Sequence, residues 1–396
     1  MNARPAVDFR NVDIVFGAER AAALAMIDAG ASRAEILEKT GAVLGCAGAN
    51  LTVHEGEISV LMGLSGSGKS TLLRAVNGLN EVARGEVIVH DGEWSADVVT
   101  CGEDNLRKIR RECVAMVFQQ FALLPWRTVE ENVGFGLELA GVPEKERKER
   151  VARQLKLVSL DQWARKYAHE LSGGMQQRVG LARAFATEAP ILLMDEPFSA
   201  LDPLIRTKLQ DELLELQAKL KKTIVFVSHD LEEALKLGTH ITIMEGGRIV
   251  QTGAPEDIVL RPANDYVRDF IANVNPLSVL TAWNVMRDRR DLEKAGDDGW
   301  VWLDRRRTTR FRIDSDGLVA AAERDGKPVV WVSVDDVEKL PDDAPHVFWA
   351  KPGTSLKLVM LAMHRSQTAP VALFDDQSHF VGAIGIRDVL SAVLRR

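Results

Sequence analysis

The sequence is poor in cysteine and has no long apolar run. Only 3 of its 396 residues are cysteine, and an odd number without regular spacing argues against a disulfide framework or a cysteine metal site. The longest stretch without a charged residue, 270–286, includes several asparagines and a proline and is shorter than the ~20 mainly apolar residues of a spanning helix. The opening residues MNARPAVDFR lack the apolar segment of a secretory signal. We therefore expect a soluble protein of a reducing compartment, which reaches a membrane only by docking on another protein.

Charge and tryptophan are unevenly distributed along the chain. The formal net charge is −7, and residues 276–396 contain 18 basic and 18 acidic residues, so the excess of negative charge lies in the first 275. Five of the 8 tryptophans come after residue 275. The length predicts two or three domains, and we expect one domain over 1–275 and a second over 276–396. The acidic balance gives no indication of a nucleic-acid partner.

A glycine-rich loop follows a short apolar run that is predicted to be a buried strand. The strand candidate is 57–62, the loop over 63–70 reads Gly-Leu-Ser-Gly-Ser-Gly-Lys-Ser, and a helix is predicted over 71–78. This order matches a P-loop, in which backbone N–H groups and a helix N-terminus hold phosphate. Lys69 is expected to reach the β- and γ-phosphates, and the Ser70 hydroxyl to ligate Mg²⁺. A glycine-rich turn without a ligand is the alternative, which the strand–loop–helix context disfavours.

A second apolar run ends in two acidic residues. Residues 191–194 are Ile-Leu-Leu-Met, and Asp195 and Glu196 follow. Acids at the carboxyl end of a buried strand lie at the sheet edge where ligands bind. We therefore expect Asp195 in the Mg²⁺ coordination shell, and Glu196 as a general base or water-orienting residue for attack on the γ-phosphate.

Another candidate phosphate site lies about 100 residues after the first. Ser172, Gly173 and Gly174 precede a helix-forming run over 178–186, and such a helix start can bind an anion. One ATP does not need two such sites in one chain. Two chains arranged head-to-tail would use both, which makes a homodimer plausible.

Five motifs together resemble those of the nucleotide-binding subunit of an ABC transporter. They are the P-loop at 63–70, Leu-Ser-Gly-Gly-Met-Gln-Gln at 171–177, the apolar strand with its acids at 191–196, Ser-Ala-Leu-Asp at 199–202 and Ser-His-Asp at 228–230. The resemblance implies a P-loop α/β fold with a helical subdomain. It also implies ATP and Mg²⁺ as cofactors, and ATP hydrolysis coupled to transport.

The resemblance assigns the site residue by residue. Gln119 matches the glutamine that contacts Mg²⁺ and the attacking water, with Gln120 as a weaker candidate, and His229 matches the histidine that contacts the γ-phosphate. Phe16 stands where the family places an aromatic residue that stacks on adenine, although an aromatic residue there could serve packing alone. The residues expected to bind nucleotide are Phe16, Gly63, Leu64, Ser65, Gly66, Ser67, Gly68, Lys69, Ser70, Thr71, Ser172, Gly173, Gly174 and Asp202, and the expected metal ligands are Ser70, Gln119 and Asp195.

A single cassette with a separate tail resembles an importer ATPase, whose partners are integral-membrane permeases and, indirectly, an extracytoplasmic substrate-binding protein. The segment 18–48, expected to be a helical insertion, resembles that of quaternary-amine importers for choline, glycine betaine and L-proline. Residues 7–17 resemble the choline branch more closely. The apolar segment 117–133 is expected to form a groove for a permease coupling helix. Some of its residues are expected to belong instead to the ordinary core of the helical subdomain. The expected location is peripheral, at the cytoplasmic face of the inner (plasma) membrane.

Residues 344–396 resemble a CBS-type repeat, and 283–340 a degenerate first repeat, so the tail would be a smaller α/β regulatory module. Nucleotide-binding copies carry Ser or Thr three residues before a final Asp. Here Asp388 is present but Gly385 replaces the hydroxyl, which argues against adenosine binding. The arginines within 305–312 could contact anionic lipid or lie on the solvated face of a strand.

Two other interpretations stay open. The chain could be a soluble regulatory ABC ATPase without a permease, which co-purification of membrane subunits would decide. The tail could instead be mainly a protein-interaction module.

Overall fold

The computed structural model describes residues 4–119, 122–199, 201–296, 299–337 and 345–394. It divides into two compact units, Met1–Ile258 and Val259–Arg396. Residues 259–275 therefore group with the second unit, although the change in composition had suggested a boundary near 275. Gln120, the weaker candidate beside Gln119, lies outside the described residues, as do residues 121 and 200.

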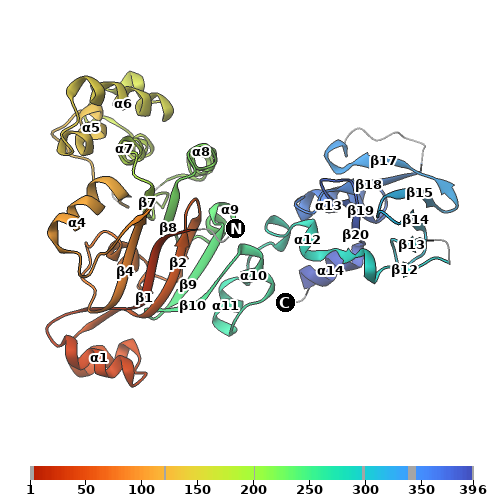
Figure 1. Cartoon of the computed structure of the whole chain (residues 1–396), viewed down its shortest axis with the longest axis horizontal. Coiled ribbons are helices and arrows are strands. Elements are labelled where there is room, and N and C mark those ends of the chain that lie inside the picture. The colour runs from red at the N-terminus through yellow and green to blue at the C-terminus, as the bar shows by residue number, and fades with distance from the viewer. Residues whose placement is uncertain (1–3, 120–121, 200, 297–298, 338–344, 395–396) are drawn as a thin grey trace. The chain divides into compact units, whose positions relative to one another are not determined.

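A six-stranded sheet forms the centre of the first unit, in the order β10-β9-β3-β8-β7-β6 (Figure 1). Neighbouring strands from β6 to β9 are parallel, and only β10 is antiparallel. All residues of β3, β7 and β8 are buried, as in parallel sheets covered on both faces. The strands are β3 (Ile58–Met62), β6 (Val114–Val117), β7 (Ile191–Asp195), β8 (Thr223–Val227), β9 (His240–Glu245) and β10 (Arg248–Gly253). The buried strands predicted over 57–62 and 191–194 are confirmed as β3 and β7.

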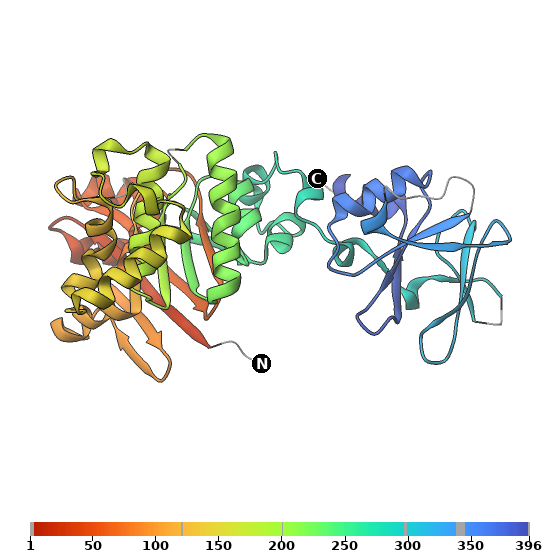
Figure 2. The ribbon, with the colours of Figure 1, turned by 90° about the horizontal axis from the view of Figure 1, so that it is seen from above.

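Several helices precede or follow these strands along the chain. They are α3 (Lys69–Ala75), α4 (Gly102–Lys108), a π-helical turn (Ile109–Cys113), α8 (Pro203–Leu220), α9 (Leu231–Leu237) and α10 (Pro255–Leu260). The long α8, in green, runs along one side of the unit (Figure 2). Asp202 caps α8 by accepting a hydrogen bond from the backbone N–H of Ile205, which fixes where that helix starts.

The same unit contains an antiparallel sheet in the order β2-β1-β4-β5. Its strands are β1 (Pro5–Phe16), β2 (Val43–His54), β4 (Arg84–Asp91) and β5 (Trp94–Asp97). The connection from β1 to β2 carries α1 (Arg20–Asp28) and α2 (Arg33–Thr40). Ser32 and Glu35 form a capping box at the start of α2. The helical part of the 18–48 insertion ends at Thr40, because residues from Val43 onward pair with β1.

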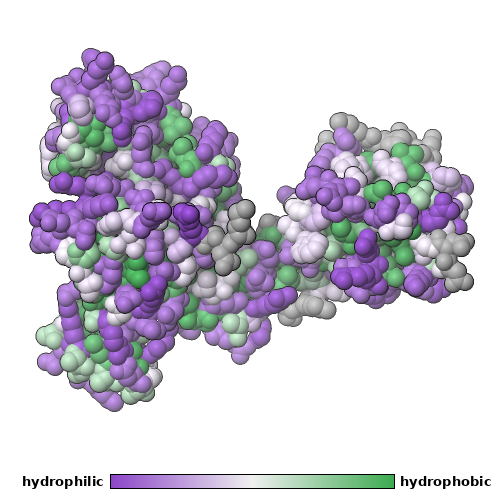
Figure 3. Space-filling view, in the orientation of Figure 1, coloured by the Kyte–Doolittle hydropathy of each residue, from purple (hydrophilic) through white to green (hydrophobic). Residues whose placement is uncertain are grey.

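A helical subdomain lies at the other end of this unit from α1 (Figure 1). It consists of α5 (Val129–Leu139), α6 (Glu144–Leu157) and α7 (Gly173–Ala186). Its own core includes Val133, Leu155 and Val179. Over α5 and α6 the surface is mainly hydrophilic, with smaller hydrophobic areas between (Figure 3).

The second unit contains two sheets. The first, in the order β11-β20-β19-β18-β17, consists of β11 (Arg287–Asp288), β17 (Val330–Ser333), β18 (His346–Ala350), β19 (Val371–Phe374) and β20 (Phe380–Ile384). The other is antiparallel and consists of β12 (Glu293–Lys294), β13 (Trp300–Trp302), β14 (Thr309–Ile313), β15 (Val319–Arg324) and β16 (Lys327–Pro328). The helices are α11 (Asp265–Phe270), α12 (Ala282–Val285), α13 (Leu356–Arg365) and α14 (Ile386–Leu394).

In the region that resembles a CBS-type repeat, the elements follow one another in the order β18-α13-β19-β20-α14. Within 283–340, which was expected to be a degenerate first repeat, the strands β12–β16 form the antiparallel sheet, and β17 joins the sheet of β18, β19 and β20. Within the described ranges, no helix of either unit is long and apolar enough to cross a membrane.

Candidate nucleotide-binding site

The loop between β3 and α3 has the backbone that a phosphate cradle needs. Gly63 and Gly68 have φ values of +142° and +101°, which side-chain-bearing residues rarely adopt. A Cβ on Gly63 would lie 2.1 Å from the carbonyl oxygen of Met244, and one on Gly68 would lie 2.3 Å from that of Gly45. Two close backbone approaches therefore require glycine at both positions.

Lys69 begins α3 and is buried. Its Nζ donates to the carbonyl oxygens of Gly63 at 2.8 Å and Leu64 at 3.0 Å. Burial lowers the pKa of Lys69, while the nearby charges of Glu196 and Asp195 act in the opposite direction. The predicted phosphate-binding lysine therefore lies across the loop, within the electrostatic reach of both acids.

Asp195, at the end of β7, is the buried acid of the site. Its Oδ1 accepts a hydrogen bond from Ser70 Oγ at 2.6 Å, and its Oδ2 accepts from Nε and Nη2 of Arg74 at 3.1 and 2.8 Å. The two predicted metal ligands Ser70 and Asp195 thus lie together. Arg74 was not predicted. The sequence could have indicated this residue, because Arg74 comes four residues after Ser70 and so lies on the same face of α3.

Glu196 brings the predicted catalytic residues together. Its Oε2 lies 3.2 Å from Nε2 of Gln119 and 3.2 Å from Nδ1 of His229. Because β7 and β8 are paired neighbours, the residues that follow them meet at one sheet edge. Glu196 has a φ of +46°, and its backbone N–H donates to the carbonyl of Val227 at 3.1 Å. Backbone strain of this kind clusters at functional sites.

The donor set also fits a hard divalent cation. Ser70 offers a hydroxyl, Asp195 a carboxylate and Gln119 an amide oxygen, and Mg²⁺ prefers a few oxygen ligands together with water and phosphate. The part of the chain that the structure describes contains no group of three or more His, Cys, Asp and Glu side chains suited to a metal. A cation held by Ser70, Asp195 and Gln119 would have one protein carboxylate and would take phosphate oxygens and water as its other ligands.

A cavity of about 350 Å³ joins the P-loop to the end of β1. It is lined by Phe16, Arg33, Val43, Gly45, Ser65, Gly66, Gly68, Lys69, Ser70, Thr71, Gln119 and Glu196. A Cβ on Gly45 would lie 2.9 Å from the Phe16 ring and 2.7 Å from the Thr71 methyl group. The predicted aromatic residue therefore lies beside the P-loop helix. Arg33, from the insertion, is a lining residue that the sequence did not suggest.

The second candidate phosphate site is not part of this cavity. Ser172 caps α7 by accepting from the backbone N–H of Met175 at 3.4 Å, and Gly173 begins that helix. Ser172, Gly173 and the capping residue Asp202 are exposed. Within one chain, Ser172, Gly173 and Asp202 therefore do not line the P-loop cavity.

The fold and the site define a P-loop ATPase of the ATP-binding cassette class. The model of the family described as "ABC transporter" matches residues 46–199. The dimeric structure of a post-hydrolysis state of the ATP-binding cassette MJ0796, bound to ADP and Pi, is similar with a TM-score of 0.53 and 32% identity, covering 63% of this chain and 98% of that one.

Named relatives narrow the class. The glycine betaine/proline betaine transport system ATP-binding protein ProV of Escherichia coli (strain K12) is 51% identical over 281 residues, which are 71% of this chain and 69% of ProV. The choline transport ATP-binding protein OpuBA of Bacillus subtilis (strain 168) is 44% identical over 223 residues, 56% of each chain. The chain belongs to the ABC transporter ATP-binding proteins of the quaternary-amine importer family, in which ATP hydrolysis is coupled to transport.

Proposed function

We propose that this chain is the ATP-hydrolysing subunit that powers uptake of choline. The proposal of ATP hydrolysis rests on one observation: Gln119 and His229 both contact the carboxylate of Glu196 beside the cavity that Lys69 lines. The choice of choline rests on the resemblance of residues 7–17 to that branch of the family. Glycine betaine is the second candidate, because the sequence identity of this chain to the glycine betaine/proline betaine protein ProV, 51%, is higher than its identity to the choline protein OpuBA, 44%.

The site residues have separable roles in hydrolysis. Lys69 and the loop N–H groups bind the phosphate chain, and Phe16 stacks on adenine. Glu196 accepts a proton from the attacking water, while His229 and Gln119 hold the carboxylate and the water in line with the γ-phosphate. Mg²⁺ held by Ser70, Asp195 and Gln119 would neutralise charge that develops on the phosphates. The overall charge of −7 gives ATP no general attraction, so binding depends on these local groups.

Two chains arranged head-to-tail would complete each site. The start of α7, where Ser172 and Gly173 are exposed and Gly174 is half-buried, and the exposed Asp202 would come from the partner chain. The cassette MJ0796, to which this chain is similar, has a dimeric structure. Closing of the dimer on ATP would drive paired permeases, and hydrolysis would reopen it.

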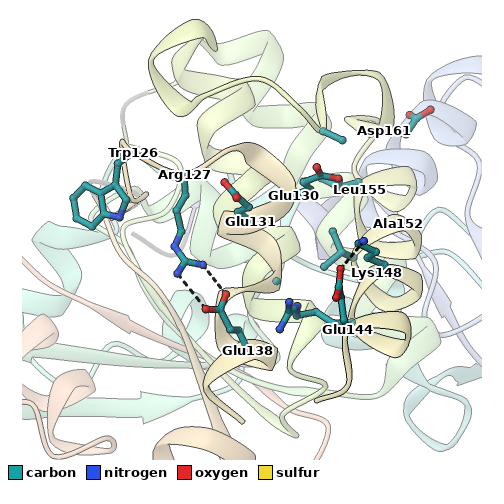
Figure 4. A pocket seen from close by; sticks show the side chains of 14 residues that line it. Trp126, Arg127, Glu130, Glu131, Glu138, Glu144, Lys148, Ala152, Leu155 and Asp161 are labelled. Carbon is teal, nitrogen blue, oxygen red and sulfur yellow. Dashed lines mark hydrogen bonds and ion pairs between the residues drawn. The ribbon is translucent and has the colours of Figure 1, made fainter. Parts of the chain in front are cut away.

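A groove of about 810 Å³ over α5 and α6 is the proposed permease-docking site (Figure 4). Trp126 on its rim is 71% exposed. The ion pair of Arg127 and Glu138, at 2.7 Å, lies to one side and that of Glu144 and Lys148, also at 2.7 Å, to the other. An amphipathic helix with apolar and charged side chains would fit such a groove. The predicted segment 117–133 is partly core, because Val129 and Val133 are buried.

Docking on permeases would place the chain at the cytoplasmic face of the membrane, indirectly coupled to an extracytoplasmic substrate-binding protein. We assign the tail a regulatory role that does not use adenosine. Asp388 is already held by Nε of Arg287 at 3.0 Å and by the backbone N–H of Gly385 at 2.7 Å. Lipid contact has weaker support, because Arg307 pairs with Glu293 and Arg310 pairs with Glu323.

The experiment that separates the two amines is ligand binding by the substrate-binding protein that works with this ATPase. Calorimetric titration with choline and with glycine betaine would show which ligand is bound more tightly. Tighter binding of choline supports the proposal, and tighter binding of glycine betaine replaces it by the second candidate.

A further inference from the structure

The two-helix insertion α1–α2 is packed against the strands beside the nucleotide cavity. Ile27 and Ile36 are buried in a small core with Val15 and Leu44 of the adjoining strands. Arg84 of β4 forms a bidentate pair with Asp28, with distances of 2.9 and 2.7 Å. The insertion is therefore packed on the ATPase sheet and can hold a side chain at a defined position.

Arg33, the first residue of α2, is the insertion residue that reaches the site. Its Nη1 donates to the carbonyl oxygen of Gly66 in the P-loop. An ideal Cβ on Gly66 would lie 3.6 Å from that nitrogen. The capping box of Ser32 and Glu35 fixes the start of α2, and Arg33 lines the same cavity as Phe16 and Lys69.

The charge of Arg33 has no carboxylate partner in the described part of the chain. The nearby carboxylate of Glu35 accepts from the backbone N–H and hydroxyl of Ser32 instead, both at 2.7 Å. By contrast, Arg20 of α1 pairs with Glu81 at 2.8 Å. A guanidinium has five N–H donors. Among the described residues, the guanidinium of Arg33 donates to one acceptor, the neutral carbonyl oxygen of Gly66. A guanidinium that has no carboxylate partner and lies beside a P-loop is suited to bind an anionic ligand.

We propose that Arg33 is a nucleotide-positioning residue that donates to β- or γ-phosphate oxygens of ATP. The planar fork of arginine matches phosphate oxygens and forms charge-assisted hydrogen bonds with them. The insertion thus supplies a second cation besides Lys69, from outside the P-loop. This inference rests on ATP binding at the cavity and is independent of which amine is transported.

The test uses the purified full chain with two variants, Arg33→Gln and Arg33→Lys, and equilibrium binding of MgATP, MgADP and AMP. Arg20→Gln is the matched control, because Arg20 belongs to the same insertion and is engaged with Glu81. Loss of a charge-assisted contact predicts that Arg33→Gln weakens MgATP binding by about tenfold. Arg33→Lys is expected to weaken it less, since the charge remains without the fork. AMP binding and the melting temperature should stay as in the control.

Two results would overturn the proposal. One is MgATP binding by Arg33→Gln equal to that of the Arg20→Gln control. The other is an equal loss for AMP and MgATP, because this would mean that Arg33 only supports the loop through Gly66. If Arg33→Gln does not fold, Arg33→Lys decides, and unchanged MgATP binding by that variant would count against a fork contact. No permease or amine is present, so the result does not depend on the transported substrate.

Discussion

Nδ1 of His229 lies 3.2 Å from Oε2 of Glu196, although the two residues follow different strands. β7 and β8 are hydrogen-bonded neighbours, so their carboxyl ends place both side chains at one sheet edge. Gln119, after β6, reaches the same carboxylate. The candidate catalytic group is therefore produced by three adjacent parallel strands.

Replacing Glu196 by Gln tests the role of its carboxylate. The amide keeps the shape but cannot accept a proton, so kcat for ATP hydrolysis should fall by about 10²–10⁴-fold. Binding of MgATP should persist, and the variant should accumulate as an ATP-bound dimer in size-exclusion chromatography. Turnover near the wild-type rate would remove Glu196 from the catalytic role.

Arg74 holds the buried carboxylate of Asp195 through two donors. Arg74→Ala leaves part of that carboxylate without its partner, so the free energy of unfolding should fall by about 1–3 kcal/mol. The Mg²⁺ concentration needed for half-maximal ATP binding should also change, because Asp195 loses its fixed orientation. Chemical denaturation and Mg²⁺ titration measure the two effects.

Arg107→Ala is the control for that experiment, since its pair with Glu103 is exposed and should matter by less than about 1 kcal/mol. Equal effects of the two substitutions would contradict a specific role for Arg74.

Gly63→Ala should abolish nucleotide binding, because the added methyl group would lie 2.1 Å from the carbonyl oxygen of Met244. Gly92→Ala is the matched control. Gly92 also has a positive φ, of +62°, but nothing lies within 4 Å of its ideal Cβ. The control should lose some stability, about 1–2 kcal/mol from the left-handed backbone, and still bind ATP. Equilibrium binding of a fluorescent ATP analogue distinguishes them, and retained affinity in Gly63→Ala would contradict the assigned loop geometry.

Glu233, on α9 after His229, should make stability depend on pH. Its pKa is raised from the ordinary value, chiefly by burial, while hydrogen bonds from Ser228 and Gln210 act against the rise. The folded state therefore keeps this proton to a higher pH than the unfolded state. Its contribution is fully present below the ordinary pKa and is lost as the pH rises through the raised one.

Glu233→Gln cannot titrate, so its stability relative to the wild type should increase as the pH rises above the ordinary pKa of a glutamate and through the raised pKa of Glu233. Urea unfolding at several pH values measures this difference. A constant difference across the range would show that Glu233 does not carry the effect.

That the candidate site residues lie close together could be predicted largely from the sequence, because most of them follow strand ends. The glycines of 63–68, and the acids after 191–194, occupy positions that only a few local structures allow. Arg33 and Arg74 were missed because their role depends on contacts with Gly66 and Asp195, which are distant in sequence. The antiparallel sheet of 293–328 was also missed, since its strands have two to six residues and give little periodicity.

The most direct measurement of the central claim is ATP-driven uptake by the chain assembled with its permeases in sealed vesicles. The substrate-binding protein and labelled choline or glycine betaine are supplied outside the vesicles, and MgATP inside. The wild-type complex should accumulate one of the amines, and the Lys69→Ala complex, which lacks the phosphate-binding lysine, should accumulate neither. Equal uptake by the two complexes, or no uptake of either amine by an assembled wild-type complex that hydrolyses ATP, would contradict the account.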